Sequence, residues 1–262
     1  MVYIKKINQK EKSKIESIRT IPEIQELSLP SIVIGRYLIT PRAKTIRPRL
    51  RPRIEEMVEL LKALYVFDQP RYSDGIYSFA RKGRNNNDDE PYYAYIEREV
   101  NILLTETRVN EKLIDIYEMC LKQWRSAIEK YRGTQFDCYN VLHGDIHLGN
   151  IVRYKNKLKL IDWEYLRSGP KEMEIAFYLF WDHLNKDDIS GDISFFNGEL
   201  LYCVESQLIN EQEANRIREM LIPMWIILCI CGISNGKLLF QSDRIEMCNS
   251  WGQRYMEKQF LS

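Results

Sequence analysis

The spacing of apolar positions along the chain changes near residue 50. Val2 to Ile7 and Ser31 to Thr40 are rich in β-branched and aromatic residues, which predicts strands or a hairpin. Between them, Ile15 and Ile18 stand at helical spacing and predict a helix from Glu11 to Arg19. The start of the chain is therefore expected to alternate between strand and helix.

Beyond a basic, proline-interrupted connector from Pro41 to Arg53, the apolar spacing is mainly helical. One helical face is predicted by the recurrence of Ile54, Met57, Val58, Leu61, Leu64 and Tyr65. A short hairpin is predicted where Ile151 to Tyr154 and Leu158 to Asp162 flank three polar residues. Helical spacing resumes at Lys171.

These patterns predict an α+β fold with two lobes. We place the lobe boundary in the connector, with a small β-rich lobe over residues 1–45 and a mainly helical lobe over residues 46–262.

The longest apolar run, Leu221 to Ile233, is shorter than a bilayer span and contains Pro223, which favours a buried core helix. The first ten residues lack the apolar stretch of a signal peptide. The cysteines show no zinc-knuckle spacing and are expected to be reduced thiols (Cys120, Cys138, Cys203, Cys229, Cys231 and Cys248). We expect a cytoplasmic protein without a membrane partner.

The charge of the 262-residue chain is nearly balanced overall, at +1, but it is unevenly distributed. Residues 1–54 hold 13 basic and 4 acidic side chains, a net of +9, so the remainder carries −8. The basic connector lacks interleaved aromatic residues for base stacking, which favours a solvated linker over a nucleic-acid arm. Electrostatic attraction of nucleotide phosphates is a third interpretation of the cluster.

The segment from Val141 to Tyr165 carries the pattern that points to chemistry. Asp145 stands two residues after His143 and five before Asn150, and the predicted hairpin then leads to Asp162. This is the order of the catalytic loop of kinases. Phosphoryl transfer needs one carboxylate to deprotonate an acceptor hydroxyl and separate oxygen ligands to hold magnesium. Asp145 suits the first task, and Asn150 and Asp162 suit the second.

The string His-Gly-Asp-Ile-His-Leu-Gly-Asn at residues 143–150, followed by Ile-Asp-Trp-Glu-Tyr at residues 161–165, resembles the aminoglycoside phosphotransferase and choline kinase superfamily. Members of that superfamily carry H-G-D-x-x-x-x-N and I-D-[WF]-E. The resemblance extends more loosely to the whole chain as a bilobal protein-kinase-like fold with a truncated N-lobe. The second string is nearer to choline and ethanolamine kinases and the first to antibiotic kinases, so the motif leaves the acceptor open.

The resemblance implies a role for each matching residue. Asp145 would be the catalytic base, Asn150 and Asp162 would bind Mg²⁺, and His143 would brace the loop. Glu174 stands where the superfamily usually has an aspartate that pins the catalytic loop. His147 has no second metal ligand spaced near it, which favours a packing or hydrogen-bonding role.

The N-terminal strand resembles the kinase strand whose lysine contacts nucleotide phosphates, and either Lys5 or Lys6 fits that place. The acidic partner of that lysine would be Glu11 or Glu16. The segment Leu38, Ile39 and Thr40 resembles the hinge strand whose backbone meets the adenine of ATP.

Because the lysine strand begins at residue 2, we expect the glycine-rich lid over the phosphates to be absent. The lid would then be dispensable, supplied by another segment or subunit, or lost together with nucleotide binding. Intact Asp145, Asn150 and Asp162 argue against the last of these.

Downstream of the metal aspartate, carboxylates are interleaved with aromatic residues, a composition that suits a cationic acceptor. Glu164 and Asp182 are the first candidates for acceptor contacts. The resulting prediction is an ATP- and Mg²⁺-dependent O-phosphotransferase for a small amine-bearing alcohol, such as an aminoglycoside, another antibiotic or an amino alcohol. The alternative is a kinase-like binding or structural protein resembling spore-coat kinase homologues.

Overall fold

The computed structural model describes residues 2–7, 9, 12, 15–16, 19, 21–46, 51–65, 92–131, 140–184, 193–234, 248–250 and 252–256. Internal packing divides the chain into two units, Met1–Asn86 with Cys138–Glu174 and Asn87–Asp137 with Ile175–Ser262. The first unit thus joins the N-terminal strands to the segment with the kinase-like motif. This division follows packing, and the lobe boundary at residue 45 stays a prediction.

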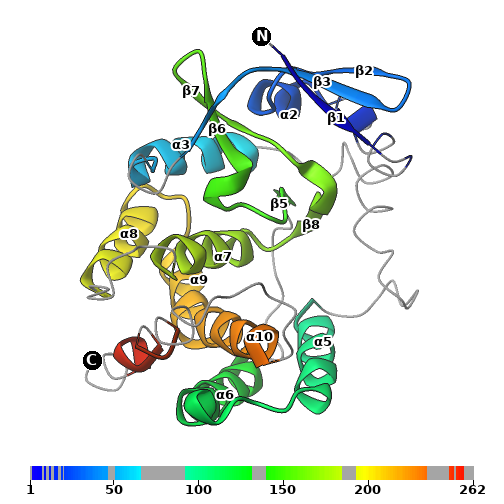
Figure 1. Cartoon of the computed structure of the whole chain (residues 1–262). Helices are drawn as coiled ribbons and strands as arrows, with labels where there is room; N and C mark the ends of the chain where they lie inside the picture. Colours follow the sequence, from blue (N-terminus) through cyan, green and yellow to red (C-terminus); the bar gives the residue numbers. More distant parts are fainter. Residues whose placement is uncertain are drawn as a thin grey trace. The chain divides into compact units, whose positions relative to one another are not determined.

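The elements of the first unit are mostly short strands, shown in Figure 1. In chain order they are β1 (Val2–Lys6), α2 (Pro22–Leu27), β2 (Ile32–Ile34), β3 (Tyr37–Pro41), β4 (Lys44–Thr45), α3 (Ile54–Tyr65), β5 (Asn140–Leu142), η4 (Leu148–Asn150), β6 (Ile151–Tyr154), β7 (Lys157–Leu160), η5 (Trp163–Tyr165) and β8 (Arg167–Gly169). The strands, hairpins and helix predicted for these regions are confirmed, whereas the helix expected within 11–19 lies largely outside the described residues.

An antiparallel sheet of order β1-β3-β2 forms the N-terminal part of the first unit. Its two-residue turn contains Gly35 at φ +60°, a left-handed conformation that glycine adopts without steric cost. Tyr3 pairs with Thr40 and Lys5 with Leu38, so these four side chains share one face of the sheet. The opposite face is largely exposed, with Ile4 at 57%.

Two further pairings position the kinase-like segment. β4 lies antiparallel to β6, so part of the expected connector is a strand joined to the β6–β7 hairpin. Lys155 and Asn156 turn this hairpin in left-handed conformations, at φ 48° and 62°. β5 pairs with β8 and thereby closes residues 143–166 into one loop.

The core of the first unit lies under α3, whose helical face was predicted from its apolar spacing. Met57, Val58, Leu61 and Leu64 are buried, and the helix contacts α2 and β5. At the start of α3, Glu56 accepts two hydrogen bonds from the Arg153 guanidinium of β6, at 2.8 and 3.2 Å. These bonds hold the pKa of Glu56 below its usual value.

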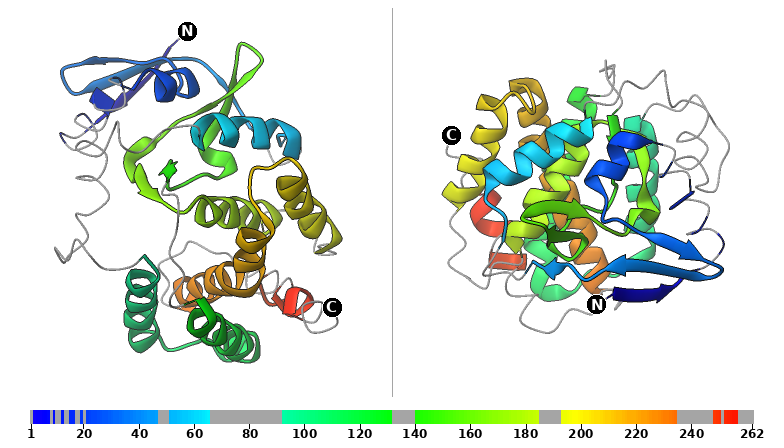
Figure 2. Two further views of the ribbon diagram at one scale, coloured as in Figure 1. Left: turned by 180° about the vertical axis from the view of Figure 1, so that it is seen from behind. Right: turned by 90° about the horizontal axis from the view of Figure 1, so that it is seen from above.

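The second unit is helical. It contains α5 (Tyr92–Glu106), η3 (Glu111–Leu113), α6 (Ile114–Tyr131), α8 (Ile193–Glu205), α9 (Glu211–Arg216), η6 (Ile217–Leu221) and α10 (Ile222–Ser234), while α7 (Lys171–Leu184) spans the division between the units. α10 packs along α6, as the two views of Figure 2 also show. The core of the second unit includes the buried side chains of Trp124, Ile116, Ile226 and Ile230.

The apolar run around Pro223 belongs to a longer helix than its sequence indicates. α9, η6 and α10 form one continuous helical stretch, Glu211–Ser234, with a π-helical turn at η6. The wider turn precedes Pro223, which has no N–H and crowds the carbonyl of the preceding turn. In the described part of the chain, this stretch is long and apolar enough to cross a membrane, but 61% of its most apolar window is buried, as in a core helix.

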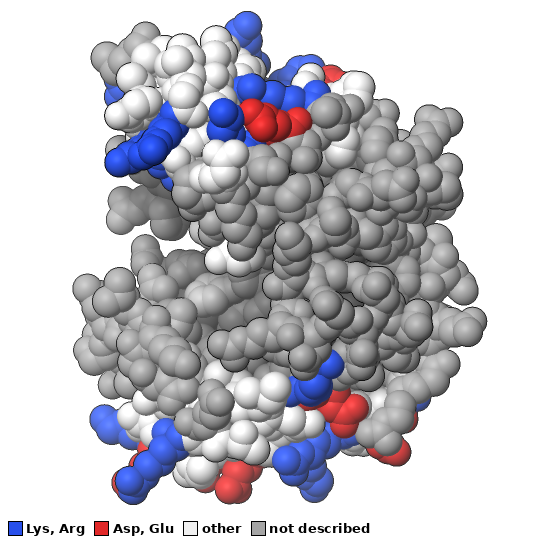
Figure 3. All heavy atoms as spheres, turned by 90° about the vertical axis from the view of Figure 1, so that its right-hand side faces the viewer, with Lys and Arg blue, Asp and Glu red and all other residues white. Residues whose placement is uncertain are grey.

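Charged side chains of both signs stand next to one another on the described surface in Figure 3.

The pair between Glu56 and Arg153 predicts a measurable contribution to stability. Glu56→Gln is expected to lower the free energy of unfolding by about 1 kcal/mol, because a charge-assisted bidentate contact becomes a neutral one. Glu55→Gln is the matched control, since Glu55 is exposed in the same helical turn and changes the same charge. Urea unfolding of both variants checks this, and equal losses would contradict it.

Candidate active site

The loop that follows β5 is anchored by its first residue, His143. His143 is fully buried, and its Nε2 lies 2.9 Å from the carbonyl oxygen of Ile161, so that nitrogen donates a proton to the carbonyl. The imidazole packs against the Trp163 ring, with ring centroids 4.5 Å apart and the planes tilted by 51°. Burial lowers the pKa of His143 to about 4. The ring is therefore neutral near pH 7 and fixes the loop to the strand end before Asp162.

Gly144 is a glycine for two physical reasons. Its φ is +84°, and an added Cβ would meet the Tyr165 carbonyl oxygen at 2.1 Å. Its N–H donates to Glu174 Oε1 at 2.7 Å, and the Tyr65 hydroxyl donates to Glu174 Oε2 at 3.1 Å. Glu174 is buried. The longer glutamate thus joins the loop to the end of α3, and Tyr65 is a contact that the sequence analysis missed.

Asp145 and Asn150 contact each other directly. The Asn150 Nδ2 donates to the backbone oxygen of Asp145 and to its Oδ2, both at 2.9 Å. This leaves the Asn150 Oδ1 as the acceptor atom of the amide. Burial alone would raise the pKa of Asp145, but the neighbouring His147 and His143 and the hydrogen bond from Asn150 outweigh it, and the net pKa is lowered. The carboxylate is therefore ionised at neutral pH.

Asp162 follows β7 in a left-handed conformation, with φ 64° and ψ 60°. Aspartate tolerates this region better than most residues. The preceding Ile161 N–H donates to the Asn150 carbonyl at 3.0 Å, which couples the two residues predicted to bind metal. The Lys5 Nζ lies 3.6 Å from Asp162 Oδ1.

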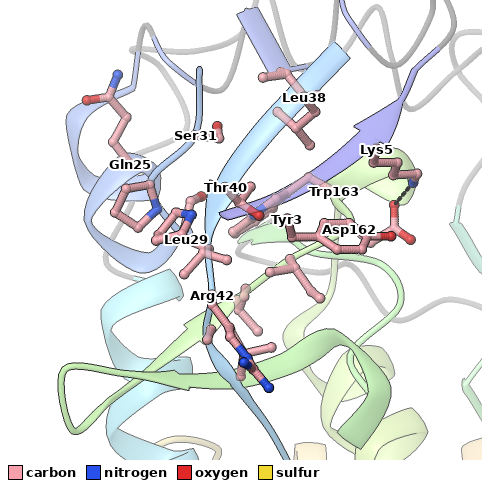
Figure 4. Close-up of a pocket in the computed structure, with 18 of the residues that line it drawn as sticks. Tyr3, Lys5, Gln25, Leu29, Ser31, Leu38, Thr40, Arg42, Asp162 and Trp163 are labelled. Atoms are coloured by element: carbon pink, nitrogen blue, oxygen red, sulfur yellow. Dashed lines mark ion pairs between the residues drawn. The ribbon is translucent and has the colours of Figure 1, made fainter. Parts of the chain in front are cut away.

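A cavity of about 940 Å³ lies within the first unit, between the β1–β3–β2 sheet and the β6–β7 hairpin. Its walls are mainly apolar, including Leu38, Val152, Leu160 and Ile161. Figure 4 shows the Lys5–Asp162 ion pair beside Trp163, away from Gln25 and Leu29. Arg19 and Arg42 line other parts of the cavity. A largely apolar cavity with basic side chains in its lining suits a nucleotide, whose base is flat and whose phosphates are anionic.

The residues predicted to contact nucleotide lie on both faces of the β1–β3–β2 sheet, and only some of them line the cavity. Lys5 lines the cavity, whereas Lys6 is exposed and alternates to the opposite face of β1. Leu38 and Thr40 line the cavity, while the side chain of Ile39 lies on the other face. Among the two proposed acidic partners, Glu16 forms an exposed ion pair with Lys12 at 3.9 Å, and Glu11 lies outside the described residues.

The two candidate acceptor residues belong to different elements. Asp182 belongs to α7 within the second unit and is buried. Glu164 belongs to η5, but its side chain lies outside the description. In the described residues, no group of three or more His, Cys, Asp or Glu side chains could hold a metal ion. Asn150 and Asp162 would offer two side-chain oxygens, which fits Mg²⁺ that also takes nucleotide phosphates and water.

Comparisons with known proteins agree with this architecture. No family model matches the chain. The chain is 51% identical over 35 residues to thiamine kinase of Shigella boydii and 35% identical over 46 residues to a LicA homolog of Mycoplasma capricolum. These matches cover 13% and 18% of this chain and only 13% and 19% of the relatives.

Solved structures match over nearly the whole chain. A choline/ethanolamine kinase family protein from Mesorhizobium loti matches with a TM-score of 0.59 and 12% identity, covering 100% of this chain and 87% of the other. An aminoglycoside phosphotransferase from Alicyclobacillus acidocaldarius matches at 0.63 and 10%, covering 99% and 86%. A thermostable mutant of the phosphotransferase APH(4)-Ia, solved with ADP and hygromycin B, matches at 0.60 and 13%, covering 92% and 81%. The chain therefore has the kinase-like α+β fold of choline kinases and aminoglycoside phosphotransferases, which confirms the predicted fold.

The buried His143 predicts a loss of stability in mild acid. The unfolded chain binds a proton at His143 near the ordinary pKa of 6.5, whereas the folded chain does so only near pH 4. The stability contributed by the neutral ring is complete above pH 6.5 and is lost as the pH falls toward 4, by about 3 kcal/mol.

His143→Gln keeps a donor for the Ile161 carbonyl but does not titrate. Urea unfolding of metal-free protein between pH 7 and pH 4 is expected to show a weaker pH dependence for this variant than for the wild type. Equal pH dependence of the two proteins would contradict the prediction.

Proposed function

We propose that the chain is an ATP- and Mg²⁺-dependent O-phosphotransferase that acts on a small amine-bearing alcohol. The observation that carries the proposal is the arrangement of Asp145, Asn150 and Asp162 around one braced loop. The Asn150 amide is fixed with its oxygen turned away from Asp145, and Asp162 lines the cavity beside Lys5. A merely structural loop would not require an ionised carboxylate and two further oxygen ligands at these places.

The chemistry assigns each residue a task. The acceptor hydroxyl gives its proton to Asp145 while its oxygen attacks the γ-phosphorus of ATP. The bond from the γ-phosphorus to the bridging oxygen breaks, and ADP leaves with that electron pair. Lys5 orients the phosphates from β1. Asn150 and Asp162 would hold Mg²⁺, which neutralises phosphate charge when bound.

ATP is the proposed donor because the cavity combines apolar walls with the Lys5–Asp162 pair, and the phosphotransferase APH(4)-Ia of the same fold was solved with ADP. An amine-bearing acceptor is favoured because that structure also holds hygromycin B and because relatives are named for thiamine, choline and ethanolamine. Glu164 and Asp182 are proposed to contact the cationic part of the acceptor.

An acceptor screen tests the proposal. Purified protein with ATP and Mg²⁺ is expected to add one phosphoryl group to at least one compound in a panel of choline, ethanolamine, thiamine and aminoglycosides, detected by mass. Asp145→Asn is expected to lower the rate by about 10²- to 10⁴-fold, because it removes the base. MgATP at 100 times its dissociation constant should stabilise the fold by about 2.7 kcal/mol in both proteins.

The outcome also separates the enzyme from a kinase-like binding or structural protein. Absence of product across the panel, together with no thermal stabilisation by MgATP, would contradict the proposal and favour a structural protein.

The cavity predicts different roles for two neighbouring lysines. Lys5→Ala is expected to weaken MgATP binding on the order of tenfold, because it removes the positive charge beside Asp162. Lys6→Ala is the matched control, with the same charge change on the opposite face of β1, and should bind MgATP within about twofold of the wild type. Isothermal titration calorimetry measures both affinities. A larger loss for Lys6→Ala would assign the phosphate contact to Lys6.

A further inference from the structure

In the sequence, His147 stands between the proposed base Asp145 and the proposed metal ligand Asn150, and it has no role in the proposed phosphoryl transfer. Its Nδ1 accepts the backbone N–H of Gly149 at 3.0 Å. A ring nitrogen that accepts a hydrogen bond carries no proton, so the proton of the neutral ring is on Nε2. The loop backbone therefore selects which nitrogen of the imidazole donates a hydrogen bond.

The donating nitrogen faces Asp145. His147 Nε2 lies 3.5 Å from Asp145 Oδ2, at the outer limit of a hydrogen bond, and such contacts tighten when a substrate binds. The Asn150 amide donates to the same oxygen at 2.9 Å. Both donors thus converge on Oδ2. Among the described residues, no donor contacts Oδ1, which remains available to a hydroxyl.

Gly149 keeps the ring in this place. A Cβ at Gly149 would lie 2.7 Å from His147 Cε1 and 2.9 Å from Nδ1, closer than side-chain atoms approach one another. The imidazole therefore packs directly over the glycine backbone, which restricts its rotation although the side chain is 37% exposed. A half-buried histidine whose tautomer is selected by a backbone N–H and whose ring is restricted is suited to holding a neighbour in one orientation.

We infer that His147 is a positioning residue that, through Nε2–H, holds the Asp145 carboxylate with Oδ2 toward the loop and Oδ1 toward the acceptor hydroxyl. The inference rests on the proposed function, since it concerns the orientation of its base. A carboxylate held by Asn150 alone can pivot about that contact, whereas a second donor on the same oxygen fixes its plane. His147 would therefore affect the rate of transfer rather than the binding of nucleotide.

Steady-state kinetics with MgATP and whichever of choline, thiamine or hygromycin B the wild type phosphorylates test this role. His147→Leu is expected to lower kcat on the order of tenfold while the KM for MgATP stays within about twofold. His147→Gln, which keeps a donor near the Nε2 position, should recover most of the loss. In an Asp145→Asn background, His147→Leu should cause no further loss, because the group it orients is gone.

Lys157→Leu is the control, since it alters an exposed side chain of the same segment on β7. It is expected to leave kcat and KM at wild-type values. Wild-type kcat in His147→Leu, an equal loss in His147→Gln, or a further loss on top of Asp145→Asn would overturn the inference while leaving the proposed function standing.

A measurement without an acceptor separates the two failures. In protein labelled with ¹⁵N-histidine, the His147 resonances are expected to report the Nε2–H tautomer, and the Nε2–H signal should shift in Asp145→Ala. A wild type that phosphorylates none of the three compounds and gains no stability from MgATP refutes the proposed function. An Nδ1–H tautomer, or a signal unchanged by Asp145→Ala, refutes the contact between His147 and Asp145.

Discussion

The hydrogen bond from the Gly144 N–H to the buried Glu174 carboxylate is the contact on which the rest of the site depends. A buried carboxylate is stable only when its oxygens are paired, and Glu174 satisfies this with Gly144 on one oxygen and the Tyr65 hydroxyl on the other. The same bond fixes the residue before Asp145 in a left-handed conformation that leaves no room for a side chain. The direction in which the proposed base leaves the loop is thereby set by helix-borne groups distant in sequence.

Further hydrogen bonds within the same loop hold the other proposed site residues in place. His143 joins the loop to Ile161, and Asn150 joins both Asp145 and the backbone just before Asp162. These contacts pre-organise the carboxylate and amide groups, which lowers the cost of ordering them for the proposed binding of nucleotide. Lys5 comes from the separate β1–β3–β2 sheet, so its ion pair with Asp162 joins two parts of the unit.

Much of this could be predicted because the information is local. The strands, α3 and the β6–β7 hairpin follow from apolar spacing and turn residues, and the kinase-like order from His143 to Asp162 is contained in one short segment. Spacing could not choose between Lys5 and Lys6, because either register of an edge strand is locally acceptable. Pairing of β1 with β3 makes the choice by turning Lys5, with Leu38, toward the cavity.

Other features depend on contacts that no local pattern contains. Tyr65 is 109 residues away from Glu174 along the chain. In the sequence, its spacing indicates only that it belongs to the apolar face of a helix. β4 forms because β6 supplies its partner, although its residues stand in a proline-interrupted connector. The sequence by itself determined the residue types and spacing on which the proposed phosphoryl transfer rests, because those are properties of one short segment. Only the tertiary structure decided which lysine enters the cavity, how the glutamate is braced and where His147 points, because each of these depends on long-range pairing or loop geometry.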